Sequence, residues 1–174
     1  GKQIIVGGDL RLRHDLIDEE MKSPCNRERI RARISITSSL KDNLSIGMQL
    51  ATGGDDPTSR NQTLGDGFSS KAIMLDRAYL SWNPSQIGGL AVTGGKFANP
   101  FVSPSSTELL WDSDLNPEGL TCRYSRKAGK TVATATAAYF IAEDRKEQND
   151  ISILGIQASI ANETPLGTLL LGAG

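Results

Sequence analysis

The feature of the sequence that most constrains its fold is an alternation of arginine and apolar residues in two short segments. Residues 9–15 read DLRLRHD, and residues 27–33 read RERIRAR. Successive side chains of a β-strand point to opposite faces, so this spacing places the arginines on one face and the apolar groups on the other. The arginines that share a face in this way are Arg11, Arg13, Arg27, Arg29, Arg31 and Arg33. Two neighbouring strands of this kind predict a sheet that is basic on one side and apolar on the other.

Length and composition limit the class of protein. The chain has 174 residues and no segment typical of a flexible linker, so we expect residues 1–174 to form one domain. Its formal net charge of −1 argues against a nucleic-acid binder or a basic membrane-surface protein. Eighteen glycines and seven prolines, without a long apolar period of 3.6 residues, indicate an all-β fold. No stretch approaches the roughly 20 apolar residues of a membrane-spanning helix, so the chain would enter a bilayer only as a barrel.

Alternation and turn residues together predict nine strands. They cover residues 8–17, 27–38, 44–52, 71–82, 89–97, 118–127, 131–142, 150–161 and 167 onward. Short turns alternate with long polar connections, which are 18–26, 53–70 and 98–117, and the highly charged connection 143–150 is intermediate in length. A meander of strands of about ten residues, with short turns at one end and long loops at the other, is the layout of an outer-membrane barrel.

The alternation fits two opposite geometries. In a soluble sandwich or barrel the apolar face is the core, whereas in a porin it meets lipid and the arginines line a water-filled lumen. Charged faces are usually solvated outer faces, which favours the soluble protein. Small apolar residues such as Ala32 and Ala158, and an aromatic content of 5%, would leave a soluble core short of large groups. A porin, in turn, should carry aromatic girdles, for which Trp82, Tyr124 and Tyr139 are few.

Several sequence blocks between about residues 8 and 125 resemble, in order and spacing, the bacterial putative porin family. The blocks are GDLRLRHDLID, RERIRARISI, LATGGDDPTSRNQTLGDGFSSK, LDRAYLSW, GGKFANPF and WDSDLNPEGL. The resemblance implies an outer-membrane β-barrel that passes small hydrophilic solutes. Members of the family are generally longer than this chain, which implies that about half of the barrel lies outside it.

The number of strands supports the same interpretation. Nine strands cannot close in the even-numbered way usual for bacterial barrels, and an open edge in lipid would leave backbone groups unpaired. We therefore expect an antiparallel up-and-down transmembrane β-barrel of 16 or 18 strands, of which this chain supplies roughly nine as the N-terminal part.

In a porin of this kind, the charged residues should line the pore rather than face lipid. Arginine at the bilayer midplane costs about 2 to 4 kcal/mol on the lipid face, so the arginines should line the pore. Further lining residues are expected at Arg77, Tyr79, Lys96 and Arg123. With the first strand rising from the periplasm, the long loops are extracellular, and the third should fold into the lumen as a constriction. Its acidic residues are Glu108, Asp112, Asp114 and, where the loop ends, Glu118.

The resulting function is passive diffusion of small hydrophilic or ionic solutes across the bacterial outer membrane. An acidic loop facing a basic wall sets up a transverse field across the narrowest point. Asp9 and Asp15 share the arginine face and could neutralise part of it, so the expected preference for anions is slight. Expected partners are the lipid bilayer, lipopolysaccharide and the solutes, with a homotrimer as one candidate assembly and no nucleic acid.

The sequence gives little support for metal binding or enzyme activity. The segment DSDLNPEG resembles the start of a calcium loop, but Pro117 and Arg123 occupy the positions that need Gly and an acid, so no metal site is expected. There is no Ser elbow, no P-loop and no His for a triad, so no enzyme activity and no cofactor are expected. Cys25 and Cys122 lack metal-ligand spacing. The alternative function is that of a soluble secreted β-sandwich or barrel that binds a ligand through loops 53–70 and 98–117.

Overall fold

The computed structural model describes residues 3–18, 25–103, 108, 111–146 and 149–174. These residues form β-strands joined by turns and loops, and among them there is no helix that could cross a membrane. The strands are β1 (Ile4–Ile17), β2 (Cys25–Ser39), β3 (Leu44–Thr52), β4 (Gln62–Thr63), β5 (Ile73–Trp82), β6 (Leu90–Lys96), β7 (Glu118–Ala128), β8 (Thr131–Glu143), β9 (Ile151–Thr164) and β10 (Gly167–Ala173).

All nine strands predicted from the sequence are present, and the all-β fold class is confirmed. The structure adds the short strand β4, extends β1 to Ile4 and extends β9 to Thr164. Parts of the predicted loops 18–26, 98–117 and 143–150 lie outside the described residues.

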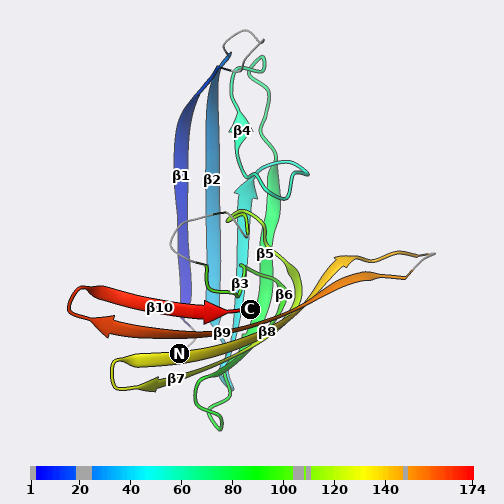
Figure 1. Ribbon diagram of the computed structural model, residues 1–174. Helices are drawn as coiled ribbons and strands as arrows, with labels where there is room; N and C mark the ends of the chain where they lie inside the picture. The colour runs from blue at the N-terminus through cyan, green and yellow to red at the C-terminus, as the bar shows by residue number, and fades with distance from the viewer. Residues whose placement is uncertain (1–2, 19–24, 104–107, 109–110, 147–148) are drawn as a thin grey trace.

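The strands form one antiparallel sheet in the order β1-β2-β3-β5-β6-β7-β8-β9-β10, with β4 paired to β2 beyond the end of β3. The sheet twists strongly, so that β1 and β2 stand upright in Figure 1 while β7 to β10 run across them. This twist follows from the right-handed twist of each strand. In the described part of the chain the sheet stays open, and β1 and β10 form its two edges.

The short turns between neighbouring strands use residues that tolerate left-handed backbone. Asp42 and Asn43, between β2 and β3, both have φ of 60°. Asp and Asn adopt this conformation more readily than other non-glycine residues, because their short side chains can bond to the local backbone. The turn closes through the amide of Leu40, which donates to the carbonyl of Leu44 at 2.7 Å. This turn fixes the register between β2 and β3, and with it the face on which each side chain lies.

The two faces of the sheet differ as the alternation predicts. The register aligns apolar residues on one face, for example Leu10 opposite Ala32 and Ile34 opposite Leu50. This apolar face is open: Leu12 is 70% exposed and Leu154 is 72% exposed. Among the described residues, the buried hydrophobic side chains are Ala51, Phe97, Ala138 and Phe140. The apolar face is therefore not the core of a sandwich.

The total surface leads to the same conclusion. The chain exposes 12378 Å². A compact soluble protein of this mass would expose about 8,200 Å². The excess comes from a sheet whose apolar face is not covered by any of the segments that the structure describes.

Candidate functional site

The arginine-bearing face of β1 and β2 is the centre of the candidate site. We call its arginines, Arg11, Arg13, Arg27, Arg29, Arg31 and Arg33, the arginine wall. The register places Arg11 opposite Arg31 and Arg13 opposite Arg29. Like charges directly opposite each other destabilise a sheet, so counter-charges have to lie close by.

Two aspartates of β1 supply part of that counter-charge. Asp15 bonds with Arg13 at 2.7 Å and with Arg27 at 3.2 Å. Asp9 bonds with Arg33 at 2.7 Å and with Arg31 at 3.3 Å. The cross-strand neutralisation expected from the sequence is therefore present at both ends of the wall.

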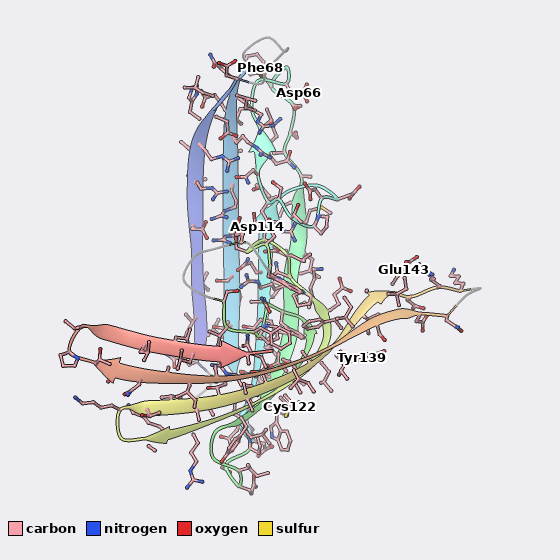
Figure 2. All side chains as sticks on the ribbon, in the orientation of Figure 1. Asp66, Phe68, Asp114, Cys122, Tyr139 and Glu143 are labelled. Carbon is pink, nitrogen blue, oxygen red and sulfur yellow. The ribbon has the colours of Figure 1, made fainter. Side chains whose placement is uncertain are left out.

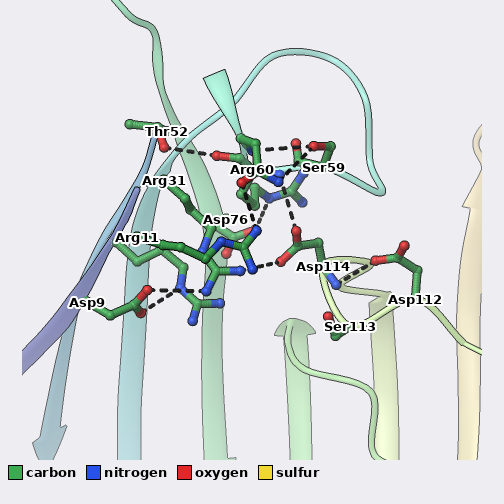
Figure 3. Close-up of polar contacts among 12 residues, drawn as sticks. Asp9, Arg11, Arg31, Thr52, Ser59, Arg60, Asp76, Asp112, Ser113 and Asp114 are labelled. Carbon is green, nitrogen blue, oxygen red and sulfur yellow. Dashed lines mark hydrogen bonds and ion pairs between the residues drawn. The ribbon is translucent and has the colours of Figure 1, made fainter. Parts of the chain in front are cut away.

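The loop between β3 and β5 is fixed to this face by Arg60. Its guanidinium donates from Nε to Oδ1 of Asp76 at 2.5 Å and from Nη1 to the carbonyl of Asp56 at 3.0 Å. The carbonyl of Arg60 accepts from the hydroxyl of Thr52 at 2.9 Å. Figure 3 shows Arg60 and Asp76 at the centre of a polar network that joins strands and loops. Arg60 thus holds the loop by both its side chain and its backbone.

A β-bulge turns Asp76 toward this network. Gln49 pairs with Arg77, but the next residue, Leu50, pairs with Leu75, so Asp76 is the extra residue in β5. A bulge re-aims a side chain in this way because two residues of one strand oppose one of the other. Asp76 then accepts from the amide of Gln49 at 2.6 Å and from the amide of Asn116 at 2.8 Å. The buried carboxylate is fully surrounded by donors, as its burial requires.

The loop between β6 and β7 crosses the same face and has a polar anchor there. Asp114 bonds with Arg31 at 3.4 Å and accepts from the amide of Arg60 at 3.3 Å. Asn116 accepts from Nε of Arg77 at 2.8 Å. Figure 2 shows Asp114 beside β2 and β3, far from Glu143 at the other end of the sheet. The loop therefore folds inward over the arginine face.

The same loop also has an apolar anchor. Phe97 and Phe140 are buried with Ala138, and Phe101 and Trp111 pack against them. The ring centroids of Phe101 and Trp111 lie 5.9 Å and 5.8 Å from that of Phe140, within the usual range for aromatic pairs. Further along the loop, the backbone of Val102 bonds in both directions with the amide of Gln157.

The absence of a side chain at Gly155 makes room for this packing. A Cβ at Gly155 would lie 2.6 Å from the ring of Phe101. Real Cβ atoms do not come this close to a ring carbon. Gly155 therefore allows the loop to approach β9 closely.

The acidic residues of the loop take different positions. The carboxylate of Glu108 accepts from the hydroxyl and the amide of Ser113, and these bonds, with the charge of Arg11, lower its pKa below the ordinary value of 4.5. Arg11 is therefore the residue of the arginine wall whose charge acts on Glu108. Asp112 instead accepts from the amide of Asp114 at 2.8 Å. Asp112 thus stabilises the turn of the loop.

Lys96 and Glu118 were expected to face the lumen, but they lie on the opposite face of the sheet. They are opposite each other in the register, and Lys96 is also opposite Ala78, so both lie on the apolar face. Their side chains form an ion pair at 2.7 Å. Phe97, the next residue, takes the inward position. Gly94 and Gly95, which precede Lys96, carry no side-chain pattern from which this orientation could have been predicted.

The remaining predicted lining residues share the arginine-bearing face. Tyr79 lies over Gly47 and packs against the buried aromatic residues. Arg77 lies beside Asn116. Arg123 is on the face of the buried Thr121 and is itself exposed, away from the arginine wall. The structure thus brings Arg77 into the polar network and leaves Arg123 apart from it.

Sequence reasoning missed Arg60, Asp76 and Asn116, which hold the two loops in place. A signal for Asp76 was available, because the adjacent charges of Asp76 and Arg77 break the alternation of β5. Arg60 and Asn116 lie in loops, where no periodicity shows which residues turn inward.

The described residues of this region form neither a metal site nor a disulfide. Within the described residues, no group of three or more His, Cys, Asp or Glu residues could hold a metal ion. Cys25 and Cys122 are both free and exposed. What the site offers is a set of fixed charges of both signs.

The chain matches a model of a known protein family. A family model described as "Putative porin" matches residues 18–157. No curated protein and no solved structure matches the chain. The matched span covers most of the chain and includes β2, both inward-folded loops and the first half of β9. The chain therefore belongs to the putative porin family.

Proposed function

We propose that the chain is part of an outer-membrane porin through which small hydrophilic or ionic solutes diffuse. The arginine wall lines the water-filled pore, and the loop between β6 and β7 narrows it. The observation that carries the proposal is the contrast between the two faces of the sheet. Leu12, 70% exposed, and Leu16, 76% exposed, lie on a face that no described part of the chain covers, whereas Arg31 is held under the loops.

Lipid is the environment that suits such an apolar face. Arginine on the lipid side of a barrel costs about 2 to 4 kcal/mol at the bilayer midplane. Six arginines on that side would prevent insertion, so the apolar side has to be the outer one. A soluble secreted β-sandwich or barrel would need the opposite arrangement, with residues such as Ile34 packed inside. Ile34 is 58% exposed.

The borders of the apolar face support insertion in a membrane. Near the loop end of the sheet, the face carries the pairs His14–Glu28 and Lys96–Glu118. Tyr139 lies on the same face close to the second pair, since it is opposite Leu120. Charged and aromatic side chains of this kind suit the level of the lipid headgroups. Trp82 and Tyr124 occupy the turn end of the face, although the girdle they form is sparse.

A pore also requires that the sheet close. The unpaired edges of β1 and β10 would be costly in lipid, because nothing there can bond to their backbone groups. We propose that further strands, from a longer chain, complete a barrel of 16 or 18 strands. A homotrimer of such barrels and contacts with lipopolysaccharide are part of the same proposal.

The charges suggest how solutes are selected. The arginine wall holds six cations, and Asp9, Asp15 and Asp114 contact it, so positive charge is in excess and the proposed preference is for anions. Glu108 and Asp114 approach from the loop side, which creates a field across the passage. Such a field orients polar solutes and favours them over apolar ones.

The test uses the natural full-length protein. Membrane fractionation is expected to place it in the outer membrane, with detergent needed for its extraction. Reconstituted in a planar bilayer, it should form water-filled channels that conduct potassium chloride. Release by salt washing without detergent, or the absence of any conductance from properly extracted protein, would contradict the proposal and favour the secreted β-module.

A further inference from the structure

We infer that Arg11 and Arg29, together with Ser59 and Asn61 above them, form a binding site for a singly charged carboxylate group carried by a solute. The inference deepens the proposed pore function by naming a class of solute. Arg11 donates to the side-chain oxygen of Asn61 at 2.7 Å. Arg29 donates to the carbonyl of Asn61 at 3.2 Å and to the hydroxyl of Ser59 at 3.3 Å. The two guanidinium groups thus converge on one short stretch of the loop between β3 and β5.

The first argument is the distribution of carboxylates along the arginine wall. Asp15 forms ion pairs with Arg13 and Arg27, and Asp9 forms ion pairs with Arg31 and Arg33. In the described part of the chain, no carboxylate lies within ion-pair distance of Arg11 or Arg29, whose hydrogen-bond partners, Ser59 and Asn61, are neutral. One aspartate is thus shared by two arginines at each end of the wall, and the two arginines in the middle have no carboxylate in ion-pair contact.

The second argument comes from donors that have no acceptor. The Nε atoms of Arg11 and Arg29 are buried, and neither has a hydrogen-bond partner among the residues that the structure describes. The same holds for Nε of Arg13, Arg27 and Arg31, but those three arginines have an aspartate as ion-pair partner. A buried donor on a charged group is costly when it is left unpaired. The oxygens of a carboxylate fit this need, because guanidinium groups bind carboxylates through two parallel bonds.

The third argument is space. A cavity of about 490 Å³ adjoins the site on the side of Arg29. Its lining includes Arg29, Ser59, Asn61 and Lys71 but not Arg11. This volume suits a small molecule. Asp55, Asp56 and Asp66 also line the cavity, so its acidic residues outnumber the cations Arg29 and Lys71. Selection for an anionic group therefore comes from the two guanidinium groups rather than from the overall field.

The position of Arg11 and Arg29 on the sheet favours a shared ligand. Arg11 is opposite Arg31 and Arg29 is opposite Arg13, so the two are diagonal neighbours on one face. Diagonal neighbours in an antiparallel pair lie about 7 to 8 Å apart at their Cα atoms, within reach of long side chains. One carboxylate between them would offset the repulsion that the register imposes.

The test uses the full-length protein with acetate as the probe and acetamide as its neutral analogue. Acetate should inhibit the chloride current in a saturable manner, and acetamide should not. The variants Arg11→Gln and Arg29→Gln should each raise the half-inhibiting acetate concentration about tenfold or more, since each removes bonds between charged groups. Lys41→Gln, which removes one cation in the turn between β2 and β3, should leave it unchanged. Arg29→Lys, which keeps the charge but not the paired bonds, should give an intermediate value.

A second measurement separates this inference from the pore proposal. Isothermal titration calorimetry of the detergent-purified protein measures acetate binding without any channel activity. Channels that conduct but show no saturable inhibition, or the same inhibition in all variants, would overturn the carboxylate site and leave the pore intact. Protein without conductance that still binds acetate through Arg11 and Arg29 would retain the site and overturn the pore. Protein that neither conducts ions nor binds acetate would overturn both the pore proposal and the carboxylate site.

Discussion

Arg60 and Asp76 form an ion pair at 2.5 Å that is almost completely buried, with 7% and 2% of the two residues exposed. The pair joins the loop between β3 and β5 to the bulge of β5. Gln49 and Asn116 donate to the same carboxylate, so the pair also reaches the loop between β6 and β7. One buried carboxylate thus connects both loops that fold over the arginine face.

The first prediction concerns this carboxylate. Asp76→Ala leaves the Arg60 guanidinium buried without its counter-charge and should lower the free energy of unfolding by about 3 to 5 kcal/mol. Urea unfolding of the full-length protein measures the change. Asp66→Ala, in the same loop but exposed, is the control and should change stability by about 0.5 kcal/mol or less. Equal effects of the two substitutions would show that Asp76 has no special structural role.

The second prediction concerns the charge of the arginine wall. Arg29→Glu changes the local charge by two units, and its partners are neutral, so no native ion pair is lost. Two unit charges about 8 Å from an ion in water alter its energy by about 1 kcal/mol, roughly a fivefold change in permeability ratio. The reversal potential in a potassium chloride gradient should move toward cations, and less so at high salt. Lys41→Glu should leave it in place. An unchanged potential for Arg29→Glu would remove this residue from the pore lining.

The third prediction tests the apolar anchor of the loop between β6 and β7. Gly155→Ala pushes against the ring of Phe101, which should cost about 1 to 3 kcal/mol of stability and loosen the loop. Single-channel conductance should rise and become noisier, because the constriction widens. Gly88→Ala, where a Cβ meets nothing within 4 Å, should behave like the natural protein. A stable variant with unaltered conductance would mean that Phe101 does not hold the constriction.

Much of this architecture could be predicted from the sequence because its signal is local. Strict alternation around Arg31 and Ile34 defines a strand and its two faces without knowledge of any partner. The turn at Asp42 and Asn43 then fixes the neighbouring register. The family resemblance, confirmed by the match over residues 18–157, rested on blocks of the same local kind.

The parts that could not be predicted depend on distant residues. Arg60 and Asp76 are buried only because the loop folds back on a bulge, and neither event has a periodic signature. Lys96 lies on the apolar face because Phe97 packs against Phe140, more than forty positions away in the sequence. Whether the sheet closes depends on strands that the nine predicted ones do not include.

The last prediction is a pH dependence that arises from Glu108. Hydrogen bonds from the hydroxyl and amide of Ser113, together with the charge of Arg11, lower the pKa of this carboxyl from its ordinary value of 4.5. A lowered pKa means that the folded state favours the ionised form. The stabilisation of the fold by ionised Glu108 is therefore fully present above pH 4.5 and is lost as the pH falls through the lowered pKa.

Below its lowered pKa Glu108 becomes neutral, and the anion preference of the pore should increase. Reversal potentials between pH 7 and pH 3 measure the effect, and Glu108→Gln should show the stronger anion preference already at pH 7. Glu163→Gln, in the turn between β9 and β10, is the control. If the Glu108→Gln profile matches that of the natural protein across this range, Glu108 does not act on the permeating ions.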